Sequence, residues 1–173
     1  DWSSDVCSSD LGNCTATTSV TITEPILVTV SATSTNVSCY GAANGTITAS
    51  ASTGATITVN GNAYNASATY GPGVYTIVAT AANGNGNGNC TATTSVTITE
   101  PIQVTINATA TNVTCNGAAN GTITASASAG ASITVNGNAY NASATYAPGV
   151  YTIVATAANG NNNGNCTATT SVT

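Results

Sequence analysis

The side chains of this 173-residue chain that could take part in covalent or ionic chemistry are six cysteines and five carboxylates. The chain has no lysine, arginine or histidine, so no cation or imidazole is available to activate a thiol or transfer a proton. Three carboxylates, Asp1, Asp5 and Asp10, lie in the first eleven residues, and the others are Glu24 and Glu100. We therefore expect no enzymatic activity, no metal site and no cofactor.

The cysteines follow an internal repeat with a period of 76. The segment TATTSVTITEPI begins at Thr15 and again at Thr91, and its first seven residues return at Thr167. Residues 15–90 and 91–166 differ at only ten positions. Periodicity of this kind is typical of repeat architectures. The predicted units are 12–25, the terminal strand of a truncated upstream repeat, 26–101, one repeat, and 102–173, a repeat without its last four residues.

The first eleven residues, DWSSDVCSSDL, do not fit this period. They should align with residues 77–87, IVATAANGNGN, yet no position agrees. Over their whole length they resemble one reading frame of a common sequencing-library adapter. We interpret residues 1–11 as an artefact and exclude Cys7 and the three aspartates from any site. The alternative is a natural acidic arm at the N-terminus.

With that segment set aside, each repeat has two cysteines at a constant spacing. Cys39 and Cys90 of one repeat recur as Cys115 and Cys166 in the next, and Cys14 is equivalent to Cys90. Two cysteines without histidine are too few for a zinc site, which needs about four nitrogen or sulfur ligands. They instead indicate a disulfide formed in an oxidising compartment. The predicted pairs are Cys39–Cys90 and Cys115–Cys166, each stabilising its repeat by about 4 kcal/mol.

Short β-strands must position these cysteines. In TSVTIT, which starts at Thr94, Val96 and Ile98 share one face, and in TITASAS Ile47 alternates with hydroxyl side chains in the same way. This period of two predicts half-buried strands. Turn sequences such as VNGN, YGPG and NGNGNGN separate them, and no segment has helical spacing. The pattern predicts an all-β fold of antiparallel β-sandwich modules with a thin core, stiffly coupled because TEP runs directly into the next strand.

Three segments carry a family resemblance: VTCNGAANGTITASAS, PGVYTIVATAANG and NCTATTSVTITEP. They resemble the SprB-type repeat of very large cell-surface adhesins from gliding Bacteroidota, over residues 12–173. The resemblance implies a secreted, surface-displayed, Ig-like module strung in tandem, with an adhesive or scaffolding role. The chain departs from the family at Ala81 and Ala157, where an aspartate often follows the tyrosine-led strand. A cation or ligand site that depends on that carboxylate is therefore not expected.

Asparagine is the most distinctive surface residue type. Ten asparagines begin an Asn-x-Ser/Thr sequence, only a modest excess over chance, and O-linked sugars on serine and threonine are an equally open alternative. Glycans would improve the solubility of a chain with so few charges. The candidate glycosylation sites are Asn13, Asn36, Asn44, Asn65, Asn89, Asn107, Asn112, Asn120, Asn141 and Asn165.

Composition also limits the partners and the location. Contacts that release counterions from nucleic acid need lysine or arginine, and the chain has neither, so we expect no nucleic acid partner. No run of 18 apolar residues is present, so no membrane insertion is expected within this segment. Disulfide-bonded surface repeats belong outside the cell, and we predict an extracellular or cell-surface location.

These features together predict a non-enzymatic structural protein, the tandem-repeat stalk of an adhesin or an extracellular fibre. It would either continue as a longer array or polymerise end to end. The orphan strand at residues 14–23 could pair with another chain, since exposed strand edges invite such pairing. Truncation explains that strand equally well, and a structure in which it pairs with nothing would count against strand donation.

The alternative function is a carbohydrate- or surface-binding adhesin module. It requires a patch of exposed aromatic side chains, because sugars stack on aromatic rings. The candidates in the first repeat are Tyr40, Tyr64, Tyr70 and Tyr75. We favour a core position for Tyr75 and its equivalent Tyr151, which argues against this function.

Overall fold

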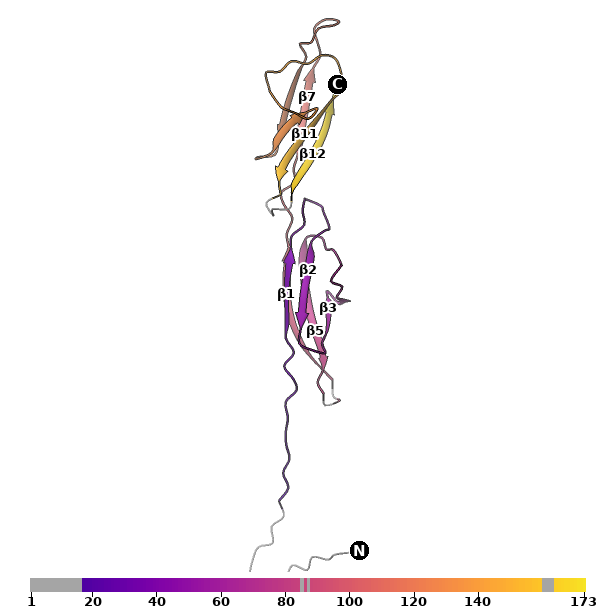
Figure 1. Cartoon of the computed structure of the whole chain (residues 1–173), viewed down its shortest axis with the longest axis vertical. Helices are drawn as coiled ribbons and strands as arrows, with labels where there is room; N and C mark the ends of the chain where they lie inside the picture. The colour runs from indigo at the N-terminus through magenta and orange to yellow at the C-terminus, as the bar shows by residue number, and fades with distance from the viewer. Residues whose placement is uncertain (1–16, 85, 87, 160–163) are drawn as a thin grey trace, which may run out of the picture.

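The computed structural model describes residues 17–84, 86, 88–159 and 164–173, and all regular structure in these ranges is β-strand (Figure 1). None of these residues forms a helix that could cross a membrane. The adapter-like segment 1–11, together with Cys14 and Asn13, lies outside the described residues. The predicted all-β, antiparallel fold is confirmed.

The strands of the described chain form two equivalent sets, one in each repeat. The first set is β1 (Val30–Thr35), β2 (Thr46–Ala51), β3 (Thr56–Val59), β4 (Asn62–Ala63), β5 (Gly73–Ala82) and β6 (Asn89–Ile98). The second set is β7 (Ile106–Thr111), β8 (Thr122–Ala127), β9 (Ser132–Val135), β10 (Asn138–Ala139), β11 (Tyr151–Ala158) and β12 (Asn165–Val172). Equivalent strands start one period apart, except that β11 starts two positions late.

Each repeat contains a two-stranded and a four-stranded antiparallel sheet. In the first repeat β1 pairs with β2, and the larger sheet has the order β4-β3-β5-β6. The second repeat has the same two sheets, β7-β8 and β10-β9-β11-β12. An isolated bridge between Gly45 and Tyr70 connects the two-stranded sheet to the segment before β5.

The predicted VNGN turn is a two-residue hairpin. Asn60 and Gly61 connect β3 to β4 with φ angles of 47° and 82°. Both values are positive, as a type I′ turn requires, and Asn-Gly is the sequence that tolerates them best. Asn136 and Gly137 adopt the same conformation in the second repeat.

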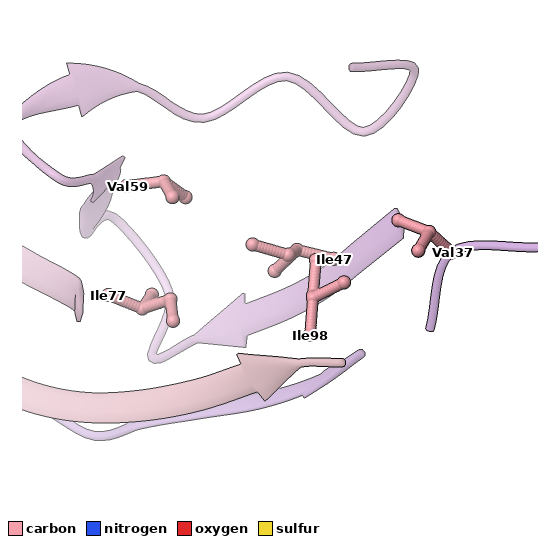
Figure 2. Packing of buried hydrophobic residues seen from close by; sticks show 5 residues of the cluster. All are labelled: Val37, Ile47, Val59, Ile77 and Ile98. Carbon is pink, nitrogen blue, oxygen red and sulfur yellow. The ribbon is translucent and has the colours of Figure 1, made fainter. Parts of the chain in front are cut away.

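The core of the first repeat lies between its two sheets. Its buried side chains come from β2, β3, β5, β6 and the segment after β1, and they converge in Figure 2: Val37, Ile47, Val59, Ile77 and Ile98. The alternation in TSVTIT and TITASAS therefore predicts the correct inward face. A second, smaller buried cluster in the same repeat contains Val28, Ala79 and Ala81, so the core is thin because valine, isoleucine and alanine supply all the buried side chains of both clusters.

Strands β1 and β6 lie side by side and run in the same direction. The Ser34 hydroxyl donates to the Thr97 carbonyl at 2.9 Å, and the Val37 amide donates to the Thr99 carbonyl at 3.2 Å. The residue numbers of the two contacts increase together, from Ser34 to Val37 on one segment and from Thr97 to Thr99 on the other, so the two segments are parallel. In the second repeat β7 contacts β12 in the equivalent position. We call each such pair, β1 with β6 and β7 with β12, the spine of its repeat.

The two repeats follow one another along the long axis of the molecule (Figure 1). Residues 99–105 connect β6 to β7 without forming a strand or a turn. The last strand of the first repeat therefore leads directly into the first strand of the second. This places the end of one repeat next to the beginning of the other.

Candidate functional site at the joint between the repeats

Three segments meet where the repeats adjoin. They are the turn at residues 39–42 of the first repeat, the connection at residues 99–105, and the start of β12 at residues 165–167. We call this region the joint.

The turn at the joint presents Cys39 from a fixed backbone. The Ala42 amide donates to the Cys39 carbonyl at 3.0 Å, and Gly41 has a φ of 75°. A turn with positive φ at its third residue favours glycine there, which explains the Cys-x-Gly-Ala sequence. The amide of Ser38 donates to the Asn44 side chain at 2.9 Å and fixes the residue before the turn. The cysteine is thus held on a rigid support.

Glu100 ties this turn to the end of β6. The Gly41 amide donates to the Glu100 carboxylate oxygen Oε2 at 2.8 Å. A hydrogen bond to an ionised acceptor is stronger than one between neutral groups. The carboxylate therefore stabilises the turn, which is the role that we expect for a glutamate at a repeat boundary.

The described residues contain one disulfide, and it crosses the joint. Cys39 of the first repeat is bonded to Cys166 of the second, with their Cα atoms 5.6 Å apart and a sequence separation of 127. Cys166 is the second residue of β12, opposite Ala157, and only 5% of it is exposed. The bond therefore joins the turn of one repeat to the last strand of the next.

The predicted pairing of Cys39 with Cys90 and of Cys115 with Cys166 is wrong. Cys39 follows the end of β1, whereas Cys90 is at the start of β6. Because β1 and β6 run in the same direction, these positions lie at opposite ends of the repeat. They are separated by about 30 Å, the length of nine extended residues, whereas a disulfide requires Cα atoms within about 7 Å.

Cys90 and Cys115 are free thiols in this chain. Cys90 is half-buried and lies opposite Ala81, as its equivalent Cys166 lies opposite Ala157. Cys115 is exposed, on a turn closed by a 3.0 Å hydrogen bond from the Ala118 amide. Neither thiol has a neighbouring cation, because the chain contains none.

The described residues bring no three metal-ligating side chains together. Comparison with known protein families identifies the repeat itself. The sequence model of the SprB repeat matches residues 31–70 and residues 107–146. Each of these two segments is therefore similar to an SprB repeat. No curated protein and no solved structure gives a significant match.

The matched segments cover only part of each 76-residue repeat of this chain. They run from β1 to Tyr70 and from β7 to Tyr146, so the final hairpin of each repeat lies outside. Cys39 is inside the match, and its partner Cys166 is outside it. The disulfide therefore links the matched portion of the first repeat to the final hairpin of the second, which lies outside the match.

The tyrosines of the two repeats stabilise the fold. The Tyr64 hydroxyl donates to the Ile47 carbonyl and accepts from the Ala49 amide, both at 3.1 Å, and so occupies the free edge of β2. Tyr70 and Tyr75 form an edge-to-face pair with ring centroids 5.0 Å apart. All three pack against the core cluster.

The second repeat places Tyr140, Tyr146 and Tyr151 in the same roles. Of the four candidate tyrosines in the first repeat, only Tyr40 is more than half exposed, and the second repeat has Asn116 there. The described residues therefore form no exposed patch of aromatic side chains, which the alternative function as a carbohydrate-binding module requires.

The candidate glycosylation sites fall into two structural groups. Members of the first group use the side-chain oxygen to fix a local backbone turn or neighbouring strand: Asn36, Asn44, Asn65, Asn120 and Asn141. Members of the second group are exposed at strand ends or on strand surfaces: Asn89, Asn107, Asn112 and Asn165. The recurrence of Asn44 and Asn65 as Asn120 and Asn141 thus has a structural cause that does not involve sugars.

The described part of the orphan strand, residues 17–23, is not paired with any of the strands in the described residues. Residues 17–29 form no strand, and the side chains of Val20 and Ile22 are 83% and 93% exposed. Its equivalent position in the second repeat is filled, because β12 pairs with β11 along its whole length. A donated copy of residues 14–23 would therefore have to displace β12, which counts against strand donation.

Proposed function

We propose that this chain is a segment of an extracellular, non-enzymatic stalk in which SprB repeats are joined end to end in a longer array. The repeats hold an adhesive surface protein away from the cell or form its fibre. The SprB match supports a cell-surface, adhesin-like role. The observation that carries the proposal is the disulfide between Cys39 and Cys166, because it fixes one repeat to the next.

A stalk must transmit force along its axis, and the joint is built for that. Two covalent links cross it, the backbone at residues 99–105 and the disulfide. The hydrogen bond from Gly41 to Glu100 holds the turn against the end of the first repeat. A joint with two covalent links resists bending more than a single flexible linker does.

Each repeat has the features of an Ig-like β-sandwich module, and this is the fold we propose for the unit of the array. Two antiparallel sheets contribute side chains to one core in the first repeat. Strands of both sheets alternate buried and exposed residues, as sandwich strands do. The partners of the module are the adjoining repeats, and glycans on exposed asparagine or threonine side chains would shield its nearly uncharged surface.

The shape of the oxidised chain in solution tests the proposed stalk. A compact chain of 173 residues has a radius of gyration of about 16 Å. We expect small-angle X-ray scattering to give a value roughly 1.5 times larger or more, because the repeats extend along one axis. A radius close to that of a compact chain would contradict the proposal.

The location is tested on cells that produce the protein. We expect gold-labelled antibodies against the folded repeat to bind intact cells and to mark thin projections from their surface. Labelling that appears only after the envelope is permeabilised would contradict a surface stalk. Mass spectrometry of the same material checks whether asparagine or threonine side chains carry sugars.

A further inference from the structure

The two free thiols occupy positions at which the equivalent cysteines are bonded. Cys115 lies one period after Cys39, and Cys90 lies one period before Cys166. The bond between Cys39 and Cys166 therefore uses one cysteine of each kind. Each repeat has a turn cysteine at its far end and a strand cysteine at its near end.

Cys115 is presented like Cys39, although it has no partner here. Its turn has the same 3.0 Å hydrogen bond from the Ala118 amide, and Gly117 has a φ of 78°. Asn120 fixes the preceding Thr114 as Asn44 fixes Ser38, with an amide-to-oxygen distance of 3.0 Å. The turn therefore has the same geometry without the disulfide, so the bond is not needed to create it.

Cys90 is equally well placed. It is the second residue of β6, as Cys166 is the second residue of β12, and both face alanine on the neighbouring strand. The partner of Cys90 would approach from the near end of the first repeat. That is the end from which residues 17–29 arrive (Figure 1).

We propose that Cys115 and Cys90 form the same disulfide with adjoining repeats of the array. Cys115 would bond the strand cysteine of the following repeat, and Cys90 would bond the turn cysteine of the preceding one. The inference rests on the proposed array. Every joint of the array would then be crossed by one disulfide, and we call this series of disulfides the ladder.

Each new bond is formed by oxidation of two thiols. The thiolate of the turn cysteine attacks a low-molecular-weight disulfide such as oxidised glutathione, forms a mixed disulfide and releases one thiol. The thiolate of the strand cysteine then displaces the second thiol and completes the protein disulfide. The two cysteines lose two electrons and two protons, and the small disulfide is reduced to two thiols.

The ladder has a mechanical consequence that follows from the path of the chain. From Cys90 the backbone runs through β6, the connection at residues 99–105 and β7 to Cys115. The disulfide at Cys115 then leads to the strand cysteine of the next repeat, where the same path starts again. We call this covalent route a cable.

Two cables run through the array, displaced from each other by one repeat. Within each cable, one extended backbone segment spans two consecutive repeats, and a disulfide then crosses the joint to the following repeat. The two strands of every spine, β1 with β6 or β7 with β12, belong to different cables. Strands β2 to β5, which lie between Cys39 and Cys90 in sequence, are outside both cables.

The cables limit how far the array can be stretched. The segment from Cys90 to Cys115, about 25 residues long, spans at most about 90 Å when fully extended, and it covers two repeats. Without disulfides, the roughly 150 residues of two repeats could extend to about 520 Å. Because the segment from Cys90 to Cys115 is already extended in the folded chain, the oxidised array cannot lengthen much by unfolding.

Disulfide mapping in a chain with one more joint tests the ladder. The chain is extended after Thr173 by a copy of residues 98–173, folded, oxidised with glutathione disulfide, denatured in acid and cleaved after tyrosine. The segment between Cys90 and Cys115 has no tyrosine, so one peptide, 76–140, carries both. The matched control variant is Cys115→Ser.

We expect two separate pairs of linked peptides. The peptide that ends at Tyr40 should be linked to the peptide that contains Cys166, and peptide 76–140 should be linked to the C-terminal peptide of the added repeat. In the Cys115→Ser variant the second link should be lost and the first retained. A link between Cys115 and Cys166, or a free Cys115 thiol in the oxidised chain, would overturn the proposal.

Stretching of single molecules tests the cables separately from the array. In an array of eight copies, we expect the oxidised form to show no unfolding steps and the reduced form to show steps approaching about 260 Å, the contour length of one repeat. Steps of that size in the oxidised array would overturn the inference. If the oxidised array is rod-shaped yet its Cys115 equivalents are free, the ladder fails and the stalk remains.

Discussion

The two repeats have nearly the same sequence but different surroundings. The first repeat continues through Ile98 to Glu100, and it has a following repeat on its far end. The second stops at Thr173, one residue before the position equivalent to Ile98. Their comparison shows what the last residues of a repeat contribute.

The difference is visible in the core and at the turn. In the first repeat Ile98 is buried, and a Cβ atom on Gly45 would lie 2.8 Å from its Cγ2 atom. In the second repeat a pocket of about 230 Å³ is bordered by Gly121, Val113 and Thr173. Val37 is fully buried, whereas its equivalent Val113 is half-exposed.

The same contrast explains why β5 is longer than β11. The first two residues of β5, Gly73 and Val74, pair with Ile98 and Thr97 of β6. Strand β11 begins at Tyr151, which pairs with Val172 of β12. The end of a repeat therefore completes its hairpin, fills its core and, through Glu100, supports the turn that bears Cys39.

The largest expected effect comes from breaking the bond that distinguishes the two turns. Cys39→Ser should lower the free energy of unfolding by about 5 kcal/mol, because the disulfide joins positions with a sequence separation of 127. Cys115→Ser changes an unbonded cysteine on an equivalent turn and should have an effect within about 0.5 kcal/mol. Urea denaturation of both oxidised variants measures the difference, and equal effects would contradict the assigned pairing.

The second prediction makes the first repeat resemble the second. Ile98→Ala should reduce the free energy of unfolding by about 3 kcal/mol, because it leaves a cavity beside Gly45 and Val37. Ile102→Ala is the matched control, since that isoleucine is 90% exposed, and it should change stability by no more than about 0.5 kcal/mol. If the two variants are equally stable in urea, Ile98 does not complete the core.

A third prediction concerns a feature that the repeats share. Tyr64→Phe and Tyr140→Phe should each cost about 1–2 kcal/mol, because each leaves a backbone amide and carbonyl of the smaller sheet unpaired. Tyr40→Phe should have little effect, since that ring is 53% exposed. Denaturation monitored for each variant checks this, and a larger loss for Tyr40→Phe would reverse the assigned roles.

The smallest effect is expected at the carboxylate of the joint. Glu100→Gln replaces a charged acceptor with a neutral one and should lower stability by less than about 1 kcal/mol. Amide hydrogen exchange should accelerate at Gly41, which donates to this carboxylate, and stay unchanged at Gly117. Equal acceleration at both glycines would show that the effect is not local to the joint.

Much of the fold could be predicted because the strands alternate so regularly. The period of two places Ile47 and Ile98 on the inward face, and both are buried. The Asn-Gly turn at Asn60 and Gly61 follows from the conformations that these residues tolerate. These features depend on local sequence, which a single chain contains in full.

The disulfide could not be assigned from spacing alone. The spacing of Cys39 and Cys90 gives their separation along the chain, but it does not show at which end of the repeat each cysteine lies. The deciding fact is that β1 and β6 run in the same direction, with one cysteine after the first strand and the other at the start of the second. That relation comes from the packing of two sheets, which is not a local property.

The roles of Tyr64 and Asn44 were also beyond sequence reasoning. Both residue types are common on surfaces that bind or carry sugars, and their hydrogen bonds to Ile47 and Ser38 join segments brought together by folding. The Asn-x-Thr pattern at Asn44 gives no sign of this second use.

The most direct test of the account is the disulfide pattern of this chain itself. The oxidised protein, denatured in acid and cleaved after tyrosine, should give the peptide ending at Tyr40 linked to peptide 152–173, which contains Cys166. Peptide 76–140, which contains Cys90 and Cys115, should be linked neither to the peptide ending at Tyr40 nor to peptide 152–173. If peptide 76–140 is instead linked to each of the other two, the disulfides lie within the repeats and the joint is not covalently closed.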